Sequence, residues 1–106
     1  MINAQFYEDK GHKLLGFHVN GHAGLADRGY DVACAAVSSA VMMTCNTATE
    51  VFKINAKVQA DENDIMLKIL SDEEGSGDKL VAGLMIQLDL ISREYPGTIN
   101  ISVNRR

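Results

Sequence analysis

Residues 31–52 read DVACAAVSSAVMMTCNTATEVF, and this run predicts a long helix on which the other elements pack. Small and apolar residues recur in it at spacings of three and four, the period of a helix face packed on a core. These residues are Ala33, Ala36, Val37, Ala40, Val41 and Thr44. Asp31 suits the N-cap, where its carboxylate can accept hydrogen bonds from the amides of Ala33 and Cys34. Because the run is apolar nearly all round, we expect the helix to be deeply buried.

Strand and helix patterns surround this predicted helix on both sides in the sequence. Apolar residues alternate with polar ones in the strand segments, and a second helix carries them at helical spacing before Tyr95-Pro96-Gly97 ends it. The predicted strands are 2–8, 13–20, 54–60, 65–70 and 98–104, and the second helix is 78–94. The order ββαββαβ predicts an α/β (α+β) fold, a two-layer sandwich with both helices packed on one face of a mixed or antiparallel sheet.

Size and composition restrict the class of protein. The chain has 106 residues and is 46% apolar, which predicts one domain over residues 1–106 with its own core. A net charge of −4 with scattered basic residues disfavours direct nucleic-acid binding. We find no leader and no apolar run of membrane-spanning length, and so expect a cytoplasmic protein that makes no membrane contact. In that compartment Cys34 and Cys45 are expected to be reduced.

A nucleophile and a base lie close together in the sequence before and within the first helix. Cys34 falls at the predicted first turn, where the helix dipole would lower the thiol pKa, and His22 lies twelve residues earlier. Between them, residues 21–31 form a predicted loop that contains Gly21, Gly24 and Gly29. We expect this loop to be flexible and to close over a bound peptide, bringing the imidazole to the thiol. A lone cysteine in an apolar helix is more often inert, so position alone leaves the two interpretations balanced.

The paired segments GHAG, residues 21–24, and GYDVACAAVS, residues 29–38, resemble the signature of the ribosomal-processing cysteine protease family, Prp. The resemblance extends over the whole chain. It implies a cysteine endopeptidase domain with a catalytic dyad of His22 and Cys34 and no metal or cofactor. It also implies a substrate: the short N-terminal extension of large-subunit ribosomal protein twenty-seven, cleaved after an aromatic residue for ribosome assembly. A cytoplasmic homodimer is implied as well.

Two residues near the dyad have candidate supporting roles. Asp31 either caps the helix or orients His22, and its spacing favours the cap. Ser38 lies one turn beyond Cys34, where its hydroxyl can bond near the sulfur or to a carbonyl of its own helix. Amides at the start of the helix are candidate oxyanion donors.

Other features have simpler interpretations. Cys45 is expected in the core, and the methionines Met42, Met43 and Met85 in core or dimer packing. The face that carries Tyr7, Met66 and Leu70 is one candidate dimer surface, and an exposed sheet edge is another. A metal site is disfavoured because the three histidines and Cys34 have no tight ligand spacing. The alternative function is a non-catalytic module that binds a ribosomal protein or assembly factor.

Overall fold

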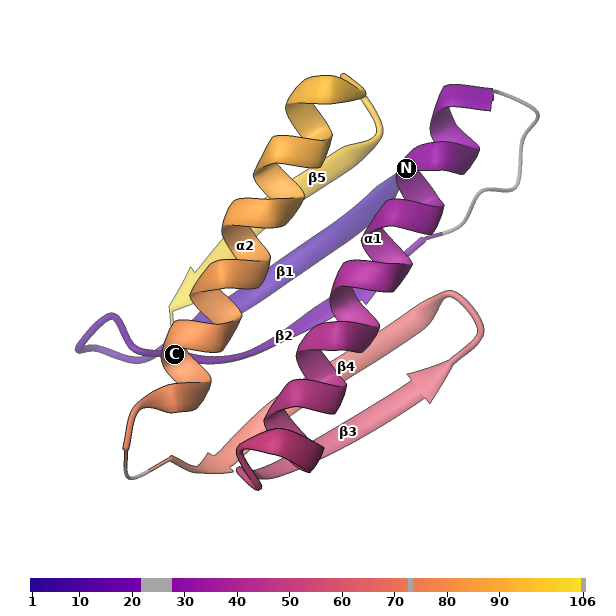
Figure 1. The fold of residues 1–106 in the computed structure, drawn as a ribbon. Coiled ribbons are helices and arrows are strands. Elements are labelled where there is room, and N and C mark those ends of the chain that lie inside the picture. The colour runs from indigo at the N-terminus through magenta and orange to yellow at the C-terminus, as the bar shows by residue number, and fades with distance from the viewer. Residues whose placement is uncertain (22–27, 73, 106) are drawn as a thin grey trace.

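The computed structural model describes residues 1–21, 28–72 and 74–105, with the backbone alone for residues 28–30. The elements follow the predicted order, ββαββαβ, and differ from their predicted bounds mainly at the ends (Figure 1). They are β1 Ile2–Glu8, β2 Leu14–Asn20, α1 Arg28–Asn46, a π-helical turn Thr47–Val51, β3 Asn55–Asp61, β4 Asp64–Ser71, α2 Ser76–Glu94 and β5 Ile99–Arg105.

The five strands form one mixed sheet in the order β3-β4-β2-β1-β5. Neighbouring strands are antiparallel except β1 and β5, which run parallel because α2 carries the chain back across the sheet before β5. Both helices lie on the same face of the sheet, side by side and antiparallel to each other (Figure 1). The predicted two-layer α+β sandwich is therefore confirmed.

The core lies between the sheet and the helix pair. Phe6 of β1 and Phe17 of β2 are fully buried at its centre, with ring centroids 6.1 Å apart. Helix α1 contributes Ala33, Val37, Val41 and Cys45, and α2 contributes Val81, Leu84, Leu88 and Ile91. Cys45 is 3% exposed, which confirms its predicted place in the core. The alternation of buried and exposed residues along β1 gives this strand one core face and one open face.

Two predictions about the first helix are wrong. The helix begins at Arg28, so Asp31 lies inside its first turn and is not the N-cap. The helix is also not buried all round, because a two-layer fold covers only its inner side and leaves Met43 65% exposed. The predicted burial in the core therefore holds for Cys45 and the inner face of α1, whereas Met43 lies outside the core.

The outer face of α1 is unusually free of charge. No Asp, Glu, Lys or Arg occurs between Asp31 and Glu50. The segment Asp31–Val51 is, by length and composition alone, apolar enough to cross a membrane, contrary to our expectation from the sequence. The core helix of a globular domain meets the same criterion, and the inner face of α1 packs on the sheet.

Candidate active site

A small cavity lies where the first half of α1 faces the ends of β1, β2 and the β3–β4 turn. Its volume is about 90 Å³, and Cys34 and Ser38 line it from the helix. The apolar walls are Ile2, Val19, Val37, Val41 and Ile65, and the polar lining is Asn20, Gly21, Asn63 and Asp64. Four segments distant in sequence therefore meet at one thiol.

Helical geometry sets the position of this thiol. Ala33 and Val37 point into the core and are buried. Cys34 follows Ala33 by one position, about 100° further around the helix, and is only half-buried. Its side chain packs against the core and also reaches the cavity. Ser38 lies one turn further along the same face, as its spacing predicts.

The electrostatic setting of Cys34 differs from the prediction. Burial raises the pKa of the Cys34 thiol, the Asp31 carboxylate raises it further, and the N-terminal ammonium group opposes both. The expected lowering by the helix dipole is wrong because α1 begins at Arg28, which places Cys34 in the second turn. Asp31 is one turn earlier on the same helix. Without a base, this thiol is therefore protonated near neutral pH.

Gly21 is fixed at the rim of the cavity. Its amide donates a hydrogen bond to the Asn63 carbonyl at 3.2 Å, and its φ of +115° disfavours any other residue. A Cβ atom here would lie 2.5 Å from the Met1 carbonyl oxygen. The segment that leads to His22 thus starts at a constrained point beside Cys34.

The loop predicted over residues 21–31 is shorter in the structure, because α1 begins at Arg28. Gly29 lies within α1, so it belongs to the helix and not to the loop. Residues 22–27 lie outside the described residues, and with them Gly24 and the predicted catalytic His22. The structure thus places Cys34, Ser38 and Gly21 around one cavity, with Asp31 one helical turn before Cys34.

Sequence reasoning missed the contribution of the β3–β4 turn. Residues 61–64 fall between the predicted strands 54–60 and 65–70, and Asn63 and Asp64 line the cavity because β2 pairs with β4. The signal was the strongly alternating pattern of both strands, but pairing of strands so distant in sequence cannot be read from it. Among the described residues, His18 contacts Asp64, and no group of three or more metal-ligating side chains is present.

The two cysteines differ in their surroundings. Cys45 is buried in the core, and burial raises the pKa of its thiol to about 11. Both thiols are free. Eleven positions of one helix separate them by about 16 Å, too far for a disulfide. Cys34 is therefore the thiol that a reagent or substrate can reach.

Comparison with known proteins agrees with the α+β fold. The family model described as cysteine protease Prp matches residues 1–100. The chain therefore belongs to the cysteine protease Prp family, and it is a cysteine protease. It is similar to the ribosomal processing cysteine protease Prp of Bacillus subtilis strain 168, with 22% identity over 98% of each chain.

Solved structures share the fold. A ribosomal processing protease Prp from S. aureus, in complex with a substrate peptide, matches with a TM-score of 0.89 and 16% identity, over 98% of this chain and 100% of that one. The S. aureus protease with a covalently linked product peptide matches with a TM-score of 0.86 and 17% identity, over the same shares. SMU.848 from Streptococcus mutans matches with a TM-score of 0.83 and 25% identity, over 100% of this chain and 96% of that one.

Proposed function

We propose that this chain is an endopeptidase with a Cys34–His22 dyad that removes the N-terminal extension of large-subunit ribosomal protein twenty-seven, a step needed for ribosome assembly. The observation that carries the proposal is Cys34, a half-buried thiol at a cavity with apolar walls and a polar rim. Membership of the Prp family and the segments GHAG and GYDVACAAVS support the assignment of the dyad.

The reaction would begin with proton transfer. Because burial and Asp31 raise the pKa of Cys34, the thiol would be mostly protonated near neutral pH and would need a base. His22 would take the thiol proton as the sulfur attacks the scissile carbonyl, then give it to the departing amine. Water, activated by the same imidazole, would add to the thioester and release the acid and the free thiol.

The donors for the oxyanion need a different assignment from that suggested by the sequence. A helix that begins at Arg28 has its free amides in the first turn, so the Cys34 amide lies within the helical hydrogen-bond pattern. In place of the Cys34 amide, the residues that line the cavity offer the Ser38 hydroxyl and the side-chain amides of Asn20 and Asn63. Loss of one such donor typically costs about 100-fold in rate.

The wider properties follow from the resemblance to the family. We propose a cytoplasmic homodimer that needs no metal or cofactor and contacts its peptide substrate without binding nucleic acid directly. The net charge of −4 is compatible with a basic ribosomal protein as substrate.

Incubation with the precursor ribosomal protein tests the proposal. The wild-type chain should shorten the precursor by the mass of its extension, measured by mass spectrometry. Cys34→Ala should leave the precursor intact, whereas the matched variant Cys45→Ala should still cleave it. A folded Cys34→Ala protein that cleaves at the wild-type rate would refute the assignment.

Membership of a cysteine protease family argues against the alternative drawn from the sequence, a non-catalytic binding module, although a raised pKa is also typical of an inert thiol. Alkylation by iodoacetamide at neutral pH tests whether Cys34 is the nucleophile. A protease requires Cys34 to react well ahead of Cys45. Equal inertness of both thiols, with no cleavage of the precursor, would refute the proposed Cys34–His22 dyad.

A further inference from the structure

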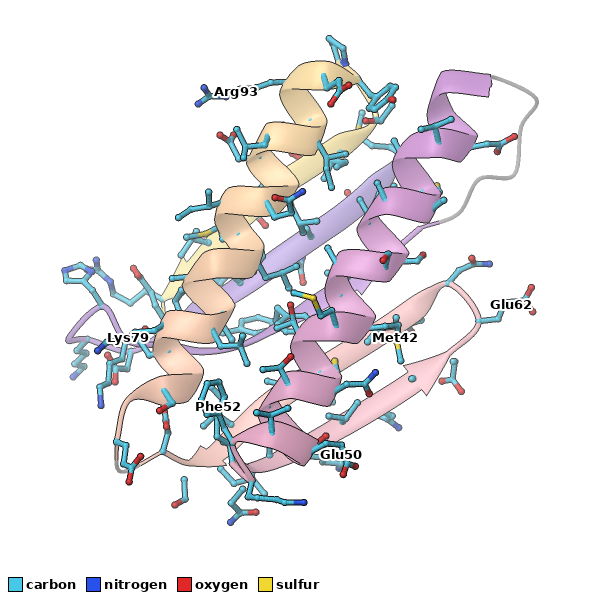
Figure 2. The ribbon with its side chains drawn as sticks, in the orientation of Figure 1. Met42, Glu50, Phe52, Glu62, Lys79 and Arg93 are labelled. Atoms are coloured by element: carbon cyan, nitrogen blue, oxygen red, sulfur yellow. The ribbon has the colours of Figure 1, made fainter. Side chains whose placement is uncertain are left out.

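The helix-facing side of β3 is an apolar surface that the helices cover only in part, because Ala56 packs against the core whereas Val58 and Ala60 are exposed. Strand β3 is an edge of the sheet, and Figure 1 shows the β3–β4 hairpin extending beyond α1. Val58 on this side is 38% exposed, and Met42 of α1, which Figure 2 shows on the hairpin side of the helix, is 39% exposed. We call Ala56, Val58, Ala60 and Met42 the β3 shelf.

The shelf is continuous with the Cys34 cavity. In the sheet register Ala60 pairs with Ile65, and Ile65 lines the cavity. Val58 pairs with the buried Leu67, so the same apolar layer runs outward from the core to the edge. From Ala56 to Ala60 the strand advances about 13 Å, which matches roughly four residues of an extended peptide.

Charge and backbone both favour an extended apolar segment as the occupant. The shelf residues carry no charge, and Lys57 lies on the opposite face of β3 because side chains alternate along a strand. Among the described residues no strand pairs with the outer edge of β3. Its free amides and carbonyls can therefore accept an added strand, a common mode of peptide recognition.

We propose that an extended, apolar stretch of the peptide substrate binds on the β3 shelf as an added strand and leads the scissile bond to Cys34. Alternate side chains of the peptide pack onto Val58 and Met42, and its backbone pairs with the edge of β3. The proposal rests on the protease function and specifies which surface selects the substrate.

Binding to an inactive protein tests the shelf separately from the chemistry. The probe is a fluorescent synthetic peptide that spans the extension and the first residues of mature ribosomal protein twenty-seven. In a Cys34→Ala background, Val58→Lys and Met42→Lys should each weaken binding about tenfold, the loss for one buried apolar side chain. Val103→Lys is the matched control, because Val103 is 46% exposed on the other edge strand and its partner Phe6 faces the core.

Cleavage and oligomeric state complete the experiment. In the active protein, Val58→Lys should lower kcat/KM for the long peptide but not for a peptide that keeps only the residues flanking the scissile bond. Equal binding by the Val58 variant and the control would overturn the shelf. A wild-type dimer that Val58→Lys converts to monomer would overturn it in favour of a second copy. Failure of the wild-type protein to cleave either peptide would instead refute the protease function, while the binding measurement still decides the shelf.

Discussion

Replacement of Gly21 by alanine tests how the rim of the cavity is held. The new Cβ would lie 2.5 Å from the Met1 carbonyl oxygen and 2.8 Å from the Ile2 Cα, both backbone atoms. The φ of +115° adds backbone strain of about 1–2 kcal/mol for a residue with a side chain. Relief of the clash would shift the start of β1 or break the Gly21–Asn63 hydrogen bond, which would lower the free energy of unfolding by about 1 kcal/mol. We expect a total loss of about 2–3 kcal/mol in the free energy of unfolding.

Gly97 provides the matched control for this variant. Its φ is +80°, but a Cβ there would have no neighbour within 4 Å, so Gly97→Ala carries the strain without the clash. Urea denaturation should show Gly21→Ala to be the less stable variant by about 1 kcal/mol or more. In thermal unfolding, each kcal/mol of lost stability should lower the Tm by roughly 4–8 °C. Peptide turnover should also fall, because Gly21 and Ile2 line the Cys34 cavity. Equal destabilisation by the two variants would refute the steric argument.

Three further outcomes follow from the structure. Asp31→Asn should move the pH profile of Cys34 alkylation to lower pH. The substitution removes the carboxylate that is the second cause, next to burial, of the raised thiol pKa. An unchanged profile would contradict this, and a fall in peptide turnover would instead support a role in orienting His22. The buried thiol of Cys45, with its pKa raised to about 11, should make the fold lose stability from about pH 9 to 11, since the unfolded thiol ionises first. Cys45→Val should reduce that loss, measured by chemical denaturation at alkaline pH. An equal loss of stability with pH in the wild type and the variant would contradict a role for the Cys45 thiol. Phe17→Ala should cost about 3–5 kcal/mol in the same assay, because it empties the centre of the core.

The element order was predictable because each segment carries its own local signal. Alternation in residues 2–8 and the helical spacing in residues 78–94 depend only on neighbours in sequence, and both patterns match the structure. The burial of Cys45 followed in the same way from its place on the apolar helix. The start of α1 did not, because Asp31 has the chemistry of a cap but no local signal excludes helix before it.

The sequence by itself determined the order of the strands and helices, the two-layer class and the family, because periodicity and a spaced motif are properties of the chain alone. Only the tertiary structure decided that β2 pairs with β4, which brings Asn63 and Ile65 to Cys34. It also decided that the pKa of Cys34 is raised and not lowered, because desolvation depends on which segments surround the thiol. Contacts of this kind join residues far apart in the sequence, and only the folded packing specifies them.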